Sequence, residues 1–247
     1  MPRYFIELAY KGTKYHGFQV QENAVTIQSE VENAFKILHR HPVSLTGSSR
    51  TDSGVHALQN FFHFDYVEEI NPHFIYKMNS ILQEDIVIKN LYAMPDDSHS
   101  RFDAKSREYE YRIHQSKNPF LKDRSYFYPY KLDMELMQEA ARIINEQTDF
   151  FAFCKSNTQV KNLRCQIMES KWQVEEEQVL IYTIKANRFL RGMVRLLTGS
   201  LLKVGRKKLE INDFKNQFIV SSKSAFSVPP HGLFLSEVTF PENYFPL

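Results

Sequence analysis

Apolar residues in the first half of the chain recur at two spacings, one typical of strands and one of helices. Alternating apolar and polar residues predict strands over Tyr4–Tyr10, Pro42–Thr46, Asn60–Val67 and Ile86–Ala93. Apolar residues three and four positions apart predict helices over Thr26–His39 and Pro72–Leu82. Thr26 or Asn23 can cap the first helix, because either side chain can accept a hydrogen bond from a backbone N–H. The resulting order, βαββαβ, is that of a split βαβ sandwich of the ferredoxin-like kind.

The second half of the chain approximates the same order. Its pattern predicts strands over Arg101–His114, Cys165–Val174, Val179–Ala186 and Leu233–Thr239, with the polar turn Glu175–Gln178 in the middle. Helices are predicted over Asp133–Asn145, capped by Asp133, and over Phe189–Val204 and Ile211–Phe218. We therefore expect an α+β protein of two ferredoxin-like halves, residues 1–97 and 98–247, with their sheets joined into one mainly antiparallel sheet and helices on one face. A cleft between the halves is the expected place for chemistry.

The composition is that of an ordered globular protein. Of the 247 residues, 43% are hydrophobic, which suffices for a sizeable core, and there is no low-complexity stretch. Cys154 and Cys165 lack the spacing of a zinc site and are too few for a disulfide framework, so we expect reduced thiols and no metal. No apolar run approaches the roughly 18 residues of a membrane span, and no signal-peptide pattern follows the N-terminus. The cytoplasm is the expected compartment.

Charge is distributed unevenly along the chain, although the net charge is only +2. From Lys185 to Lys208 there are eight basic residues and no Asp or Glu. Such a block suits a phosphate backbone, but it also suits an ordinary solvated helix face.

The sharpest local feature is the polar, glycine-bounded stretch Gly47–Ala57 between two predicted strands. Glycines allow tight turns and close approach to a ligand. Within it, Arg50 and Asp52 are two residues apart, so a guanidinium can hold a carboxylate ionised while both reach a substrate. An ionised, oriented carboxylate can act as a nucleophile or a base. The alternative is a plain turn in which Asp52 bonds neighbouring amides.

The residues of this stretch resemble a known signature. Ser49–Ala57 (SRTDSGVHA) is similar to the GRTDxGVHA signature of the TruA-type tRNA pseudouridine synthases, with Ser49 in place of Gly and Ser53 where Ala is common. The segment Tyr10–Gln19 (YKGTKYHGFQ) resembles the family's Y-x-G-x-x-Y-x-G-W-Q, with Phe18 for Trp. Further matches follow in order at Val25–Gln28, His99–Phe102, Arg107–Tyr111, Asp149–Phe153 and Asn187–Arg195. The resemblance thus covers nearly the whole chain.

The resemblance implies an isomerase that turns uridine into pseudouridine without a cofactor. It assigns Asp52 as the nucleophile or base, Tyr109 as the ring that stacks on the uracil and a candidate proton relay, and Arg195 as the residue that keeps Asp52 charged. We expect Tyr111 to be a core aromatic instead. RNA contacts are expected from these basic residues: Arg50, His56, Arg101, Lys105, Arg107, Arg188 and Arg191. For His56 a structural role is equally open.

The implied partner is tRNA, with uridines on the 3′ side of the anticodon arm (positions 38, 39 and 40) as targets, and the implied assembly is a homodimer. Two other functions remain open from the residues. One is a tRNA-binding or tRNA-folding module without catalysis, which would have little use for a carboxylate facing phosphates. The other is a nucleoside hydrolase or glycosidase, which would usually need a second catalytic carboxylate. Asp103 and Glu108 are near in sequence but lie in no matching motif.

Overall fold

The chain folds into two compact units, Met1–Lys105 with Leu235–Leu247, and Ser106–Phe234. The computed structural model describes residues 1–68, 70, 72–155, 162–175, 179–219 and 226–246. The first unit runs past the expected boundary at residue 97, and it regains the last residues of the chain. The active-site loop predicted around Asp52 therefore lies in a unit built from both ends of the sequence.

The first unit is built on an antiparallel sheet whose centre is β1 (Arg3–Tyr10). β1 pairs with β3 (His56–Asp65) on one side and with β4 (Ile86–Met94) on the other, both antiparallel. β2 (Thr46–Gly47) pairs antiparallel with β3, which gives the order β4-β1-β3-β2. This is the strand order of the expected βαββαβ arrangement, so the mixed, mostly antiparallel fold class is confirmed.

The strand predicted over Pro42–Thr46 is wrong, because only Thr46 of that range is in a strand. At Leu45, two helix side chains form the backbone hydrogen bonds that a neighbouring strand would otherwise form. The Leu45 N–H donates to Glu32 at 3.0 Å, and its carbonyl accepts from Gln28 at 2.8 Å. Pro42 has no N–H to donate. The strand predicted from Asn60 begins four residues earlier, at His56.

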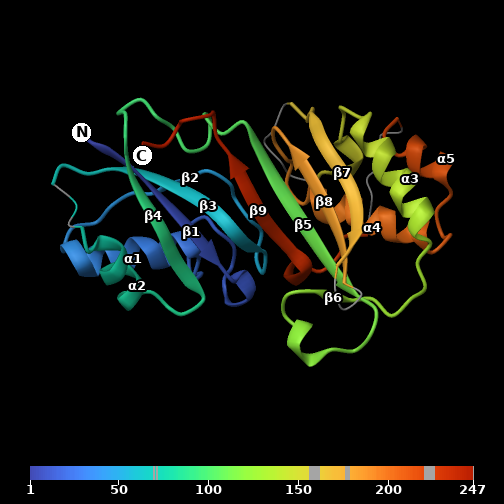
Figure 1. Ribbon diagram of the computed structural model, residues 1–247, viewed down its shortest axis with the longest axis horizontal. Helices are drawn as coiled ribbons and strands as arrows, with labels where there is room; N and C mark the ends of the chain where they lie inside the picture. Colours follow the sequence, from blue (N-terminus) through green and yellow to red (C-terminus); the bar gives the residue numbers. More distant parts are fainter. Residues whose placement is uncertain (69, 71, 156–161, 176–178, 220–225, 247) are drawn as a thin grey trace. The chain divides into compact units, whose positions relative to one another are not determined.

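Two helices cover one face of this sheet, α1 (Ile27–His39) and α2 (Phe74–Ile81), which lie together in Figure 1. Thr26, rather than Asn23, is the N-cap of α1, and it forms a reciprocal capping box with Ser29. The ring of Phe35 on α1 packs edge-on against Phe64 of β3, with 5.3 Å between the ring centroids. Both helices thus bury their apolar stripe against the sheet, as the spacing predicts.

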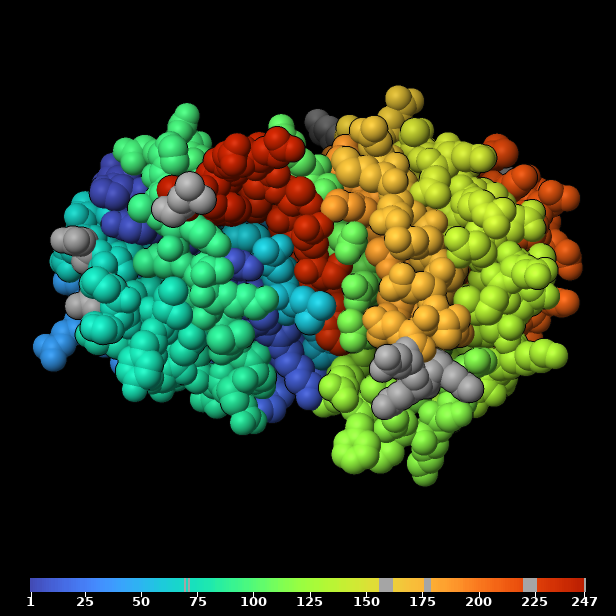
Figure 2. Space-filling view, viewed as in Figure 1, coloured from blue at the N-terminus to red at the C-terminus, as the bar shows by residue number. Residues whose placement is uncertain are grey.

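The C-terminal segment covers the opposite face of the same sheet. Phe61 and Phe5 point away from the helices, because side chains alternate along a strand. Phe240 and Phe245 pack on Phe61 with centroid distances of 5.1 and 5.4 Å. The space-filling view shows the red C-terminal residues over this part of the first unit (Figure 2). These residues follow β9 (Leu233–Thr239), whose bounds agree with the prediction and whose residues from Leu235 onward belong to this unit.

The second unit contains sheet strands in the order β5-β8-β7, with antiparallel neighbours. Its strands are β5 (Ser106–His114), β6 (Tyr126–Phe127, parallel to β5), β7 (Ile167–Val174) and β8 (Leu180–Ala186). Its helices are α3 (Met134–Asn145), α4 (Met193–Gly205) and α5 (Ile211–Asn216), which gather on one side in Figure 1. Short 3₁₀ turns in the two units are η1 (Gly12–Lys14), η2 (Pro119–Leu121), η3 (Phe151–Phe153) and η5 (Pro230–Gly232).

Two predicted boundaries in the second half of the sequence differ from the structure by four or five residues. The strand expected from Arg101 begins at Ser106, because residues 99–103 form a turn in which the Asp103 N–H donates to the His99 carbonyl at 3.0 Å. The helix expected from Phe189 begins at Met193, because Gly192 at its N-cap has a φ of 73°, a left-handed conformation that cannot continue a helix. Most of the predicted turn over 175–178 lies outside the described residues.

Within the described ranges, none of the helices combines the length and apolar character that crossing a membrane requires.

Candidate active-site loop and its partners

The loop that carries Asp52 connects β2 to β3 and is fixed on its N-terminal side through Thr51. The Thr51 carbonyl accepts a hydrogen bond from the Phe18 N–H at 3.1 Å. The Thr51 hydroxyl is 2.8 Å from the hydroxyl of Tyr10, in a buried contact. Thr51 itself is buried, whereas Asp52 is half-buried and Arg50 is exposed. The structure therefore places a carboxylate and a guanidinium near solvent on either side of an anchored residue.

The loop is fixed on its C-terminal side through Tyr15. The carbonyl of Tyr15 accepts from the Ser53 hydroxyl at 3.2 Å and from the Gly54 N–H at 3.3 Å. The Val55 N–H donates to the Asp52 carbonyl at 3.1 Å, which closes a tight turn. Gly54 has a φ of 78°, so a side chain at this position would be strained. Asp52 thus lies between Thr51 and Ser53, which are both hydrogen-bonded to the neighbouring segment.

The neighbouring chain is the segment Tyr10–Gln19, which also resembles the family. Its glycines permit the close approach: a Cβ added to Gly12 would lie 2.0 Å from the Val55 carbonyl oxygen. Gly17 has a φ of 100°, and a Cβ added to it would lie 3.0 Å from the Thr51 carbonyl oxygen. The two motifs, 30 or more residues apart in the sequence, therefore form one packed unit.

The departures from the signature have local structural explanations. Phe18, where Trp is usual, is 1% exposed and stacks on Phe62 with 4.4 Å between ring centroids. Ser53 is exposed and uses its hydroxyl to bond the Tyr15 carbonyl, which an Ala could not do. Ser49 is buried, and its carbonyl accepts from the Asn60 side chain at 2.9 Å.

His56 lies behind the loop rather than on its surface. The side chain is 1% exposed, and its Nδ1 accepts from the Gly12 N–H at 3.0 Å. An acceptor nitrogen requires the neutral ring. The burial favours the structural role for His56 over the predicted RNA contact.

In the second unit, Tyr109 and Tyr111 lie on the same face of β5 but in different surroundings. Tyr109 is 8% exposed and meets Phe189 edge-on, with 5.0 Å between ring centroids. Tyr111 is fully buried and donates its hydroxyl to the Pro229 carbonyl at 2.8 Å, and burial raises its pKa. Tyr111 is therefore a core residue, as predicted.

Arg195 lies in the first turn of α4 and is held by the segment that precedes η5. Its Nε donates to the Val228 carbonyl at 2.7 Å, and the Val228 N–H donates back to the Arg195 carbonyl at 3.3 Å. The side chain is half-buried. This anchoring orients the planar guanidinium, which is the requirement for pairing with a carboxylate in a defined geometry.

The predicted RNA-binding arginines divide by exposure. Arg50, Arg101 and Arg191 are exposed, and Arg188 is half-buried. Arg107 is 9% exposed and donates to the Asn187 carbonyl at 3.2 Å, so little of its side chain is open to solvent.

The block from Lys185 to Lys208 is not one charged surface. Eleven of the thirteen residues of α4 within it are buried. Since a helix of that length is roughly 20 Å long, the basic residues before and after it are separated along its axis.

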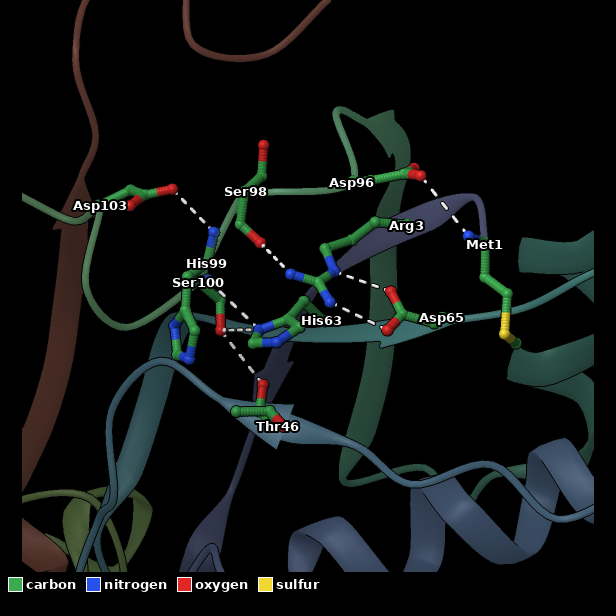
Figure 3. A network of polar contacts seen from close by, with 10 residues as sticks. All are labelled: Met1, Arg3, Thr46, His63, Asp65, Asp96, Ser98, His99, Ser100 and Asp103. Atoms are coloured by element: carbon green, nitrogen blue, oxygen red, sulfur yellow. Dashed lines mark hydrogen bonds and ion pairs between the residues drawn. The ribbon is translucent and has the colours of Figure 1, made fainter.

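A polar network holds the turn that presents Arg101 (Figure 3). The Ser100 N–H donates to Nδ1 of His63 at 3.2 Å, and the Ser100 hydroxyl donates to the Thr46 carbonyl at 3.1 Å. The Asp103 carboxylate accepts from the His99 N–H at 2.7 Å. Arg101 is 5.8 Å from the ring centroid of Phe102, whose side chain is 74% exposed.

Sequence reasoning missed the residues that support the Asp52 loop from below. Asn60 is fully buried and bonds both the Tyr10 hydroxyl, at 3.2 Å, and the Ser49 carbonyl. Asp85 accepts from the Tyr15 hydroxyl. An amide within the apolar strand run was a signal for Asn60, since buried polar groups need partners; nothing local indicates Asp85.

The described residues contain no cluster of potential metal ligands, and a surface hollow beside α3 lies away from the predicted site residues. Across the described ranges, no three or more His, Cys, Asp or Glu side chains gather as metal ligands would. A shallow hollow beside α3 is lined by charged and apolar residues that include Asp133, Arg142, Trp172 and Lys207, and by none of the predicted site residues.

Comparison with known proteins gives the family. A "tRNA pseudouridine synthase A" of Parabacteroides distasonis is 41% identical over 251 residues, which covers 100% of this chain and 99% of that protein. The chain belongs to this tRNA pseudouridine synthase family. The family's sequence model, described as tRNA pseudouridine synthase, matches residues 147–241. A Bacteroides fragilis relative of the same name is 40% identical over 98% of both chains. One from Staphylococcus aureus is 34% identical over 98% of this chain and 92% of its own. The family model includes Arg195, and the full-length relatives span Asp52 and Tyr109 as well.

Proposed function

We propose that this chain converts uridine to pseudouridine in the anticodon arm of tRNA, with Asp52 as the catalytic carboxylate. Membership of the family identifies it as a tRNA pseudouridine synthase, an isomerase. The observation that supports Asp52 is its setting: a half-buried carboxylate on a loop fixed through Thr51 and Tyr15, beside the exposed Arg50. A reacting group must be held with this kind of precision.

The reaction asks for a carboxylate next to the anomeric carbon. The N1–C1′ bond of uridine breaks, the uracil turns, and a C5–C1′ bond forms, after which the C5 proton leaves and N1 gains one. Asp52 acts either as the nucleophile toward the ribose or as the base that takes the 2′ hydrogen. Tyr109 stacks on the uracil and assists proton transfer at C5, and Arg195 keeps Asp52 ionised.

The target nucleotide has to leave its stem before it can react. Extrusion costs a few kcal/mol, which contacts to phosphates and 2′-hydroxyls must offset. Among the predicted arginines, Arg50, Arg101 and Arg191 are exposed and suit this task, and Arg50 adjoins the reacting carboxylate in sequence. We further propose that the protein acts in the cytoplasm as a homodimer, and light scattering at working concentration measures its assembly.

Two competing functions lose support. A tRNA-binding module without catalysis is disfavoured by membership of an enzyme family and by the anchored carboxylate. A glycosidase is disfavoured because Asp103, one nearby carboxylate, is occupied in holding the 99–103 turn and accepting from Tyr244.

The test is isomerisation of an unmodified tRNA transcript by wild type, Asp52→Ala and Asp52→Asn, with pseudouridine mapped by carbodiimide-based primer extension. We expect wild type to produce stops in the anticodon arm, and both variants to lose at least 1,000-fold in rate while still binding the transcript. Asp97→Ala, which removes an exposed carboxylate in the same unit, is the matched control and should retain wild-type activity. Pseudouridine formed at wild-type rate by Asp52→Ala would exclude Asp52, and stops confined to another arm would exclude the anticodon assignment.

A further inference from the structure

A second carboxylate, Asp85, is bonded to the segment that holds the Asp52 loop, and its side chain is almost fully buried. It immediately precedes β4, and its side chain is only 7% exposed. One carboxylate oxygen accepts from the Tyr15 hydroxyl, and the other is 3.1 Å from the Lys14 ammonium. A buried carboxylate is stable only with such partners. The two partners are neighbours in the segment that holds the Asp52 loop.

The side chain and the backbone of Tyr15 point to different parts of the unit. Its ring is 5% exposed, and its hydroxyl reaches Asp85. Burial and the Asp85 carboxylate raise the pKa of Tyr15, so the phenol remains a proton donor at neutral pH. Its carbonyl accepts from Ser53 and Gly54, the two residues that follow Asp52. Tyr15 therefore connects the start of β4 to the loop.

A second bond fixes the same segment to the same point. The Lys11 N–H donates to the Asp85 carbonyl at 2.9 Å, so the segment is tied to residue 85 at both Lys11 and Tyr15. Between these ties lies Gly12, whose lack of a side chain lets the segment pass the Val55 carbonyl. The bond to Asp85 fixes the position of Tyr15. The Tyr15 carbonyl in turn fixes the positions of Ser53 and Gly54.

We propose that Tyr15 and Asp85 form a positioning pair for Asp52, holding its carboxylate at the reacting position without touching the substrate. This inference rests on the proposed role of Asp52. It assigns a function to the second tyrosine of the Tyr10–Gln19 motif and to an aspartate 70 residues away from it. Because misplacement of a reacting group by about 1 Å can cost 100-fold in rate, loss of the pair lowers the rate of the chemical step.

The pair makes a distinctive kinetic prediction. Tyr15→Phe removes only the hydroxyl, and Asp85→Asn keeps the shape while removing the charge. We expect each to lower the single-turnover rate on saturating tRNA transcript by about 10- to 100-fold, with the Kd for the transcript changed less than about 2-fold. The double variant should be at most about 3-fold slower than the slower single variant, because the two residues act as one unit.

Tyr92→Phe is the matched control. Tyr92 in β4 also donates to a carboxylate, that of Glu7 in β1, at 3.3 Å. Neither residue belongs to the segment that holds the loop. Its single-turnover rate should stay within about 2-fold of wild type. Thermal unfolding of every variant gives the folded fraction, to which each rate is normalised.

The experiment separates this inference from the proposed function by including Asp52→Ala. If Asp52→Ala is inactive while folded Tyr15→Phe and Asp85→Asn react at wild-type rates, the positioning pair is refuted and Asp52 stands. A rate loss that disappears on normalisation, or that is matched by weaker binding, also refutes it. If Asp52→Ala reacts at the wild-type rate, the proposed role of Asp52 fails first.

Discussion

At the scale of single residues, the sequence indicated the proposed catalytic carboxylate better than the residues that support its loop. Asp52 and Arg50 stand in a local string whose glycines and charges are visible without a structure. Tyr15 lies in the Tyr10–Gln19 motif, but nothing in the sequence links it to Asp85, because their contact joins residues 70 positions apart. For His56 the sequence left an RNA contact and a structural role open, and the side chain is buried.

Buried histidines give this protein a stability that depends on pH. Burial lowers the pKa of His63 to about 4, and its Nδ1 is hydrogen-bonded to Ser100. The unfolded chain has an ordinary His pKa of about 6.5, so between these values it binds more protons than the folded state. The contribution of His63 to the free energy of unfolding is therefore fully present above pH 6.5. It is lost as the pH falls towards 4, by up to about 3 kcal/mol.

We expect His63→Gln to reduce that loss. The free energy of unfolding in urea, measured at pH 7 and at pH 4.5, should fall less with acidification in the variant than in wild type, whatever the variant's stability at pH 7. His41→Gln, at an exposed position, is the control and should change the pH dependence less than His63→Gln does. An identical acid loss in His63→Gln and wild type would show that this ring does not titrate as its burial requires.

At the scale of elements, the ends of helices were more predictable than the ends of short strands. Thr26 and Asp133 both cap the helices that the sequence assigned to them, because capping needs only a side-chain acceptor three residues before a free N–H. β2 was misplaced because pairing depends on a distant partner, and Leu45 gives its backbone groups to helix side chains instead. The start of α4 depended on one left-handed glycine, Gly192.

The cap of α1 offers a test at this scale. Thr26→Ala removes the acceptor for the Ser29 N–H and breaks the reciprocal box, in a residue that is fully buried. We expect the free energy of unfolding to fall by about 1–2 kcal/mol, measured by urea denaturation with an unchanged slope. Ser44→Ala, at an exposed position, should change it by less than about 0.5 kcal/mol. Equal effects of the two substitutions would contradict the capping role.

At the scale of the whole molecule, the fold class was predictable because each half repeats a familiar order of strands and helices. The packing of the C-terminal segment on the first unit was not predictable, because nothing in Phe240–Pro246 indicates which surface it covers. That surface includes Phe61, which contacts both Phe240 and Phe245. Aromatic rings on this face needed a cover, and the sequence shows them only as alternating apolar residues.

The importance of this cover can be measured with a pair of phenylalanines. Phe240 is 9% exposed and packs on Phe61, so Phe240→Ala should lower the free energy of unfolding by about 3 kcal/mol. Phe120→Ala, at a ring that is 77% exposed, should change it by less than about 0.5 kcal/mol. Urea denaturation at neutral pH measures both, and equal destabilisation by the two would contradict the assignment of Phe240 to the core.

A unit assembled from both ends of the chain has a consequence for how the protein is made. Residues 1–105 leave the ribosome first, but the face bearing Phe5 and Phe61 stays bare until residues 235–247 follow. The intervening Ser106–Phe234 takes on the order of ten seconds to synthesise at typical speeds. During that interval the nascent first unit exposes an aromatic surface of the kind that chaperones bind.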